Sequence, residues 1–463
     1  MDAKPDPPQR RPVADTWSNR VTPNDQCKAG RPARRKWWGR LLAALLGATV
    51  GCDAPAAGRP SADAPRVTAR GFGTLGLVRS DQDHADVVAN TYLQPNGAGH
   101  THRWDFGVDS KLGGQLDADF GGGLSAVLQV VAKHRYDNSW TPELEWANVK
   151  YQVSPMLSLR AGRTVSPTFM YSDTANVGYA NPWLRGPQEL YGLVPITHLD
   201  GIDLVWNTAL GAATDTVQIN FGGNSFNAVD GLDIEGSNAW IVSNTLEYSF
   251  VTARIGYLAV DLSFDSDDLD ALTNGLAELG ETLSAAGFAD AGRRADLLAD
   301  RYQVDDTPLE ILSAGLRLTP GNWLLLGEWA RLTDAGLLPR TRAWYLTAGY
   351  RLHRLRPYVT FAALDSNTSA PATIPLAGLP APLAAAVTAM DDRLGAVLQT
   401  AAPSQHSWTL GARWDLAASA AVKFEYQHVT LDDDSAGRFG NLQPDFRPGG
   451  AADLFTIAVD FVF

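Results

Sequence analysis

The glycine pattern Gly71-x-Gly73-x-x-Gly76 is the first feature with a chemical reading, because it matches a dinucleotide-binding fingerprint. That chemistry requires a strand before the glycines, and after them a helix whose N-terminus faces the pyrophosphate. The segment that follows, 79–84, is a polar loop by composition. We therefore interpret the glycines as small residues of a first strand and predict no nucleotide cofactor.

Histidines give the second candidate. His100 and His102 are spaced to present two imidazoles on one strand face toward a metal, but no third ligand has convincing spacing. Nucleophilic catalysis needs a serine beside a positioned histidine, and none of the eight histidines stands in such an arrangement. The sequence therefore predicts a solvated loop, no metal and no enzyme.

Charged side chains on one face of the period-two segments are the remaining chemical feature. By strand phase they point to the same side as one another; they are Lys133, Arg160, Arg254, Arg317, Arg351, Arg413, Asp105, Asp109, Asp203, Glu247, Glu328 and Glu425. Unpaired charges in a dry interior would cost several kcal/mol each. An enclosed, hydrated surface holds them without that cost.

The elements that position these charges are dyad-patterned segments separated by turns. About sixteen strands are expected, near 66–79, 102–117, 123–135, 143–153, 156–164, 199–208, 215–222, 238–250, 251–262, 308–318, 321–332, 341–352, 355–365, 406–417, 420–431 and 452–463. An even number is typical of single-chain bacterial barrels. At sixteen strands an aqueous channel is expected, whereas the alternative is a narrower barrel plugged by salt bridges.

Connection lengths separate a membrane barrel from a soluble sandwich. Tight turns alternate with longer connections near 80–101, 165–198, 263–307, 366–405 and 432–451, which is the outer-membrane pattern. Large aromatics also stand at segment ends, as interfacial girdles require. The predicted fold class is therefore an all-β, antiparallel, up-and-down transmembrane barrel. Two of the long connections have helical character: leucines recur at three- and four-residue steps from Leu269 to Leu283, and 382–398 is Ala-rich. We interpret both as local packing of external loops, with a partner-binding helix as the alternative.

The front of the chain has the order of a secretory signal peptide. A basic cluster at 31–40 precedes the apolar run 41–50 and the small-residue site Ala54-Pro55-Ala56. Residues 1–56 are thus expected to be an over-extended start plus a cleaved leader, and 57–463 one barrel domain. Cys52 ends a loose lipoprotein box, which is the alternative processing. The net charge of −13 argues against nucleic acid as a partner.

The last residues resemble the C-terminal signature of outer-membrane proteins. Phe455, Ile457, Val459, Phe461 and Phe463 share one face and end in a terminal Phe. The resemblance implies recognition by the β-barrel assembly machinery. It also implies an outer membrane of a Gram-negative bacterium, with a lipid bilayer and lipopolysaccharide as surroundings.

The stretch from Gly71-Phe72-Gly73-Thr74-Leu75-Gly76 to Asp200-Gly201 resembles the Gram-negative general porin superfamily. The segments Glu143-Leu144-Glu145-Trp146-Ala147 and Val177-Gly178-Tyr179-Ala180-Asn181-Pro182-Trp183 contribute to the likeness. It implies a 16-stranded barrel, a homotrimer, and a third loop at about 165–198 folded into the lumen. The loop lacks the short acidic motif of enterobacterial general porins, so the resemblance leaves its selectivity open.

A pore constriction is the predicted site. Asp173, Arg185 and Glu189 on the loop would oppose the wall residues Arg160, Arg163 and Arg254, although strand phase places Arg163 outward unless its strand has ended. Opposed rows of charge would create a transverse field that sorts solutes. The excess of acid predicts cation preference. The expected function is passive diffusion of ions and small hydrophilic solutes. Two alternatives stay open: a substrate-selective channel, and a structural or adhesive barrel.

Overall fold

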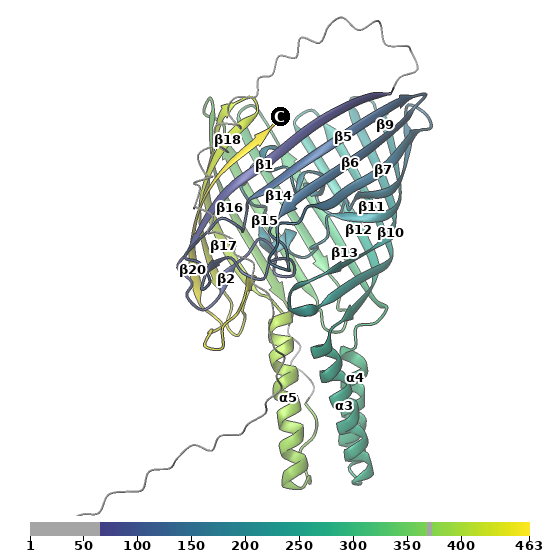
Figure 1. Cartoon of the computed structure of the whole chain (residues 1–463), viewed down its shortest axis with the longest axis vertical. Helices are drawn as coiled ribbons and strands as arrows, with labels where there is room; N and C mark the ends of the chain where they lie inside the picture. The colour runs from purple at the N-terminus through teal and green to yellow at the C-terminus, as the bar shows by residue number, and fades with distance from the viewer. Residues whose placement is uncertain (1–64, 368–372) are drawn as a thin grey trace, which may run out of the picture. The chain divides into compact units, whose positions relative to one another are not determined.

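The computed structural model describes residues 65–367 and 373–463, in which one antiparallel sheet closes on itself (Figure 1). The predicted leader, residues 1–56, lies outside the described residues. Sixteen long strands of the described part form the wall, each paired with its neighbours in the sequence. They are β1 (Arg66–Ser80), β5 (Lys111–Gly121), β6 (Leu124–Lys133), β7 (Glu143–Gln152), β8 (Leu157–Val165), β9 (His198–Leu210), β10 (Ala213–Asn227), β11 (Asp233–Tyr248), β12 (Val251–Asp265), β13 (Thr307–Leu318), β14 (Trp323–Leu332), β15 (Thr341–Tyr350), β16 (Leu355–Ser366), β17 (Gln405–Ala417), β18 (Ala420–Leu431) and β20 (Ala451–Val462).

The barrel closes where β1 pairs with β20. Gly71 and Phe463 exchange backbone hydrogen bonds of 2.8 and 2.9 Å at this seam. A Cβ atom on Gly71 would lie 2.1 Å from the ring of Phe463, and one on Gly73 would lie 2.5 Å from the ring of Phe461. The first two glycines of the motif thus allow aromatic rings to cross the seam at close approach.

Short turns and long connections alternate around the barrel, as the sequence predicted. The short turns are 122–123, 153–156, 211–212, 249–250, 319–322, 351–354 and 418–419; the longest connections are 81–110, 166–197, 266–306 and 367–404. The prediction of a strand over 102–117 was wrong at its start, because β5 begins at Lys111. The carboxylate of Asp105 accepts hydrogen bonds from the backbone N–H groups of Gly107 and Val108, which folds the chain into a turn there.

Smaller elements lie in the long connections. They are β2 (Asp86–Val87), β3 (Ala98–Gly99) and β19 (Phe439–Gly440), which form a small separate sheet; β4 (Trp104–Asp105), which joins the wall beside β1; the short helices η1 (Ser172–Thr174), η2 (Gly178–Ala180), α2 (Gln188–Tyr191) and η3 (Val229–Gly231); and the longer helices α3 (Asp267–Ala285), α4 (Ala289–Tyr302) and α5 (Ala381–Ala401). None of the described helices combines the length and apolarity needed to cross a membrane.

The outer face of the wall is apolar across the middle of the strands. Leu346, Leu410 and Ile202 are about 60% exposed although they sit mid-strand in a folded protein, and the C-terminal Phe455 and Ile457 share this face. A surface of this kind is stable only against lipid, and closure leaves no unpaired backbone edge within it.

Beyond this belt, in β10 to β13, the apolar residues of the strands face inward and the polar residues face outward. The strands β10, β11 and β12 have 15, 16 and 15 residues, longer than the ~9–11 that cross a bilayer. Near the long connections the inward residues Ile234, Leu262 and Leu309 are buried, while outward Glu235 and Asp265 are exposed. This rim therefore has an apolar interior and a polar exterior, as a water-soluble sheet does.

The helices α3, α4 and α5 stand on this rim, on the side of the long connections (Figure 1). Leu272, Leu276 and Leu283 of α3 are buried in one cluster with Ile311 of β13 and Leu394 of α5. The helical character predicted for two connections is confirmed. The helix α4 was not predicted.

Candidate functional site: the lumen and loop 166–197

The connection between β8 and β9, called loop 166–197 below, is bonded to inward-facing groups of the wall. Lys423 of β18 is fully buried, donates to the carbonyl oxygens of Gly178 (2.8 Å) and Trp183 (2.5 Å), and pairs with Asp460 of β20 at 2.8 Å. Thr74 of β1 donates to the other oxygen of Asp460 at 2.6 Å. A buried ion pair is tolerated when its remaining hydrogen-bonding capacity is satisfied; here loop carbonyls accept from Lys423, and Thr74 donates to Asp460.

Two inward glutamates also hold the loop, but as hydrogen-bond acceptors. Glu328 of β14 accepts from the backbone N–H of Met170 at 2.7 Å and from the hydroxyls of Tyr191 and Tyr345, each at 2.5 Å. Charge-assisted hydrogen bonds are roughly twice as strong as neutral ones. Glu328 therefore acts as an anchor for both ends of the loop.

Glu425 of β18 and Thr347 of β15 anchor its middle. Glu425 accepts from the backbone N–H of Leu184 at 2.7 Å and from the hydroxyl of Tyr358, while the indole of Trp183 donates to Thr347 at 2.9 Å. Several of the inward charges that the sequence identified thus seat the loop and do not face open water.

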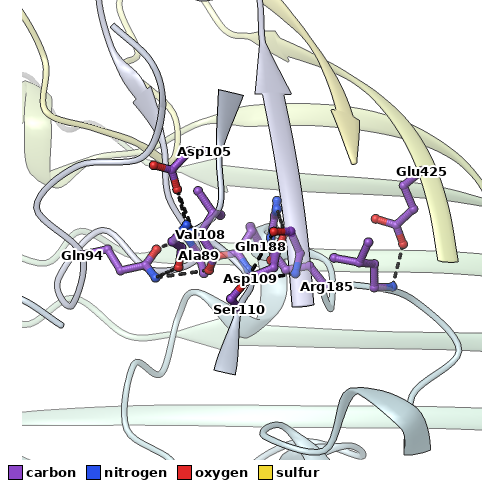
Figure 2. Close-up of polar contacts among 12 residues, drawn as sticks. Ala89, Gln94, Asp105, Val108, Asp109, Ser110, Arg185, Gln188 and Glu425 are labelled. Atoms are coloured by element: carbon purple, nitrogen blue, oxygen red, sulfur yellow. Dashed lines mark hydrogen bonds and ion pairs between the residues drawn. The ribbon is translucent and has the colours of Figure 1, made fainter. Parts of the chain in front are cut away.

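Arg185 is clamped to the connection 81–110. Its guanidinium forms two parallel hydrogen bonds with the carboxylate of Asp109, at 2.8 and 2.7 Å (Figure 2). Burial alone would lower the pKa of Arg185, but the charge of Asp109 and the hydrogen bonds to it raise the pKa above its ordinary value. A bidentate pair of this kind fixes orientation as well as charge.

The position of Asp109 follows from its surroundings. Gln94 accepts from the N–H of Ala89 and donates to the carbonyl oxygens of Gly107 and Val108, which holds the connection in shape (Figure 2). A Cβ atom on Gly76 would lie 2.7 Å from the Cβ of Asp109. The third glycine of the motif therefore gives Asp109 the room to reach Arg185.

Of the predicted loop residues, Asp173 alone presents an exposed charge. Asp173 lies in η1, is exposed, and forms no ion pair with any described residue. Glu189 is fully buried and accepts a hydrogen bond from Gln405 at 2.8 Å. Arg185 is neutralised by Asp109. The loop thus contributes one free charge where the sequence suggested three.

The predicted wall arginines divide in the same way. Arg160 pairs with the buried Asp203 of β9. Arg254 of β12 donates to the carbonyl oxygen of Pro167 at 2.5 Å and therefore borders the loop. Arg163 forms a bidentate pair with Asp200 instead. Asp200 has the opposite strand phase to the inward Asp203 and lies on the outer face with Ile202. Arg163 therefore does not face the lumen, and its prediction as a constriction residue was wrong.

A polar cavity of about 200 Å³ lies between loop 166–197, the connection 81–110 and the strands β5 and β6. Its charged lining residues are Asp109, Lys111, Lys133 and Arg185. Since Asp109 and Arg185 cancel, two lysines remain, and the cavity carries positive charge. Lys111 was not singled out from the sequence, nor was the Lys423–Asp460 pair. Inward phase was the only signal available for all three. No cluster of metal ligands occurs in the described residues.

Comparison with known proteins bears on the fold. No protein-family model and no curated protein matches the sequence. OmpF of Salmonella typhi, solved in complex with daunomycin, is similar over 87% of this chain and 98% of that chain, with a TM-score of 0.51 and 11% identity. The outer membrane channel DcaP of Acinetobacter baumannii covers 88% of this chain and 100% of its own (TM-score 0.48, 14% identity). An anion-selective porin from Comamonas acidovorans covers 86% and 100% (TM-score 0.48, 13% identity).

The fold and the lumen define the class of protein. Sixteen strands of the described residues close into a barrel with an apolar belt outside and charged groups inside, and the OmpF likeness supports the same fold. This is a porin-type fold of Gram-negative bacteria, as the sequence resemblance implied. The belt places the protein in the outer membrane.

Proposed function

We propose that the protein is a porin through which ions and small hydrophilic solutes diffuse passively, without catalysis. The observation that carries the proposal is loop 166–197, which is bonded to wall strands on several sides and leaves a polar cavity beside it. A loop fixed in this way narrows a water-filled lumen without closing it. Charged groups in such a lumen are stable because water hydrates them.

Selectivity would come from the groups that border the cavity. Lys111 and Lys133 give it positive charge, so we expect the channel to prefer anions. The overall excess of acid predicted the opposite preference, but much of that acid lies in external loops such as 432–434. Charges close to the path dominate because exposed charges farther than about 10 Å are largely screened in salt. Arg160, Arg254 and Asp173 would add the transverse field.

Planar-bilayer recording of the purified full-length protein tests this function. The wild type is expected to conduct KCl, with a reversal potential of anionic sign under a salt gradient. Lys133→Gln should move the reversal potential toward cations, and Asp173→Asn should move it toward anions. Arg163→Gln, on the outer face, is the matched control and should change neither value. Absence of ionic conductance would overturn the proposal, and identical reversal potentials in all four proteins would remove Lys133 and Asp173 from the filter.

The remaining expectations from the sequence belong to the same proposal. The C-terminal face of β20 would be read by the assembly machinery, the outer leaflet around the belt would be lipopolysaccharide, and the barrel would assemble as a homotrimer. Crosslinking in native membranes checks the trimer. A substrate-selective channel is the second candidate, and an apolar cavity beside the polar one favours it.

A further inference from the structure

The apolar cavity lies inside the rim, against the inner faces of β10 to β14. Its volume is about 110 Å³, and aliphatic side chains from four strands line most of it, including Ile241, Leu258, Leu309 and Leu332. These residues are between 1% and 7% exposed. A general diffusion path has no need of such a wall, because hydrophilic solutes gain nothing from apolar surface.

One charged group enters this apolar lining. Arg438, from the connection between β18 and β20, lines the cavity, and its Nε has no hydrogen-bond partner among the described residues. Its backbone N–H donates to Gln405 at 2.7 Å, which fixes where the side chain begins. Burial lowers the pKa of Arg438, yet an arginine stays charged at neutral pH.

No described carboxylate neutralises Arg438 at contact distance. Glu189 is the nearby acid that acts on Arg438, but no ion pair within 4.0 Å joins them, and one oxygen of Glu189 is occupied by Gln405. A largely buried guanidinium without an ion-pair partner is costly, whereas a planar anion satisfies it with two hydrogen bonds.

The apolar and polar cavities share part of their lining. Val194, Pro195 and Ile196 of loop 166–197 belong to both, and these three residues are partly exposed. The two cavities are therefore adjacent, with a single segment of chain between them. The positive charge of Lys111 and Lys133 would concentrate anions at that point.

We propose that the apolar cavity binds a small monocarboxylate with an apolar body, whose carboxylate pairs with Arg438. Its volume of about 110 Å³ is of the same order as that of an engineered apolar cavity of about 150 Å³ that takes up benzene, so the apolar body of the ligand is no larger than a single aromatic ring. The inference deepens the proposed function, because it assumes that solutes reach the lumen. It turns a general channel into one with a preferred substrate class.

Benzoate is the probe, and benzyl alcohol is its uncharged counterpart. Equilibrium dialysis of benzoate against the full-length protein in detergent micelles, corrected with protein-free micelles, should show saturable binding, and benzyl alcohol should bind at least tenfold more weakly. Arg438→Gln should raise the dissociation constant of benzoate at least tenfold. Ala239→Leu, which fills the cavity without changing its charge, should do the same. Arg293→Gln, an exposed arginine of α4, is the matched control.

Current recordings separate this inference from the proposed function. Saturable block of the KCl current by benzoate, lost in Arg438→Gln and Ala239→Leu, supports the site. A channel that conducts KCl normally while benzoate neither binds nor blocks overturns the site and leaves the porin function standing. Saturable benzoate binding in a barrel without conductance supports the site and overturns the channel. Binding that is equal in wild type and both variants also overturns the site.

Discussion

The inner wall of this barrel has two regions with opposite chemistry. Along β14 to β20 and β1, at mid-height, inward residues are charged or hydroxylated and hold loop 166–197; Lys423, Glu425 and Thr74 are examples. Along β10 to β13, near the long connections, inward residues such as Leu262 and Leu309 are aliphatic and share a buried cluster with the helices. The same two-residue period produces both. Whether the apolar residues of a strand point outward or inward depends on their depth, because the surroundings of the outer face change from lipid to water along the strands.

The largest loss of stability is expected when the buried ion pair of the polar region is removed. Lys423→Met leaves Asp460 as an unpaired buried carboxylate and removes two hydrogen bonds to the loop. Removal of one partner from a buried pair costs about 3–5 kcal/mol. Equilibrium unfolding by guanidinium in lipid vesicles measures this loss. Arg70→Met, in a largely exposed pair with Asp117, is the control and should change stability little. Equal stability of both variants would show that the pair does not seat the loop.

A charge placed on the outer face at two depths tests whether the surroundings change from lipid to water along the strands. Leu346→Arg puts a charge on the lipid-facing belt, and such substitutions cost about 2–4 kcal/mol near the bilayer midplane. Glu235→Arg puts the same side chain on the outward face of the rim, where the residue is exposed to water. The same unfolding measurement should show a large loss for the first variant and almost none for the second. Similar losses would mean that the rim also lies in lipid.

The third effect is a change in ion selectivity, and it is expected at the Arg185 clamp. Asp109→Asn removes one negative charge from the cavity and leaves Arg185 as a third cation beside Lys111 and Lys133. The reversal potential under a KCl gradient should move further toward anions. Asp290→Asn, on the exposed surface of α4, is the control. An unchanged reversal potential would show that the cavity is not on the ion path.

The sequence by itself determined the barrel. Period-two alternation, the rhythm of short and long connections and the aromatic belt are local patterns, and they placed sixteen strands. β10 ends at Asn227 where 222 was predicted, β11 begins at Asp233 where 238 was predicted, and the largest boundary error is the start of β5 at Lys111. That error arose because Asp105 folds a turn through side-chain hydrogen bonds, which alternation does not reveal. Strand phase also identified the inward charges and the outward position of Arg163.

Only the tertiary structure decided what the inward charges do. Whether Arg185 is a free cation depends on Asp109, 76 residues away, and whether Glu189 faces water depends on Gln405, 216 residues away. Pairing at such distances in the sequence leaves no periodic signal. The apolar cavity escaped the sequence for a related reason. The strands that line it alternate apolar and polar residues just as lipid-facing strands do. Only the tertiary structure shows that here, beyond the membrane belt, the apolar face is the inner one.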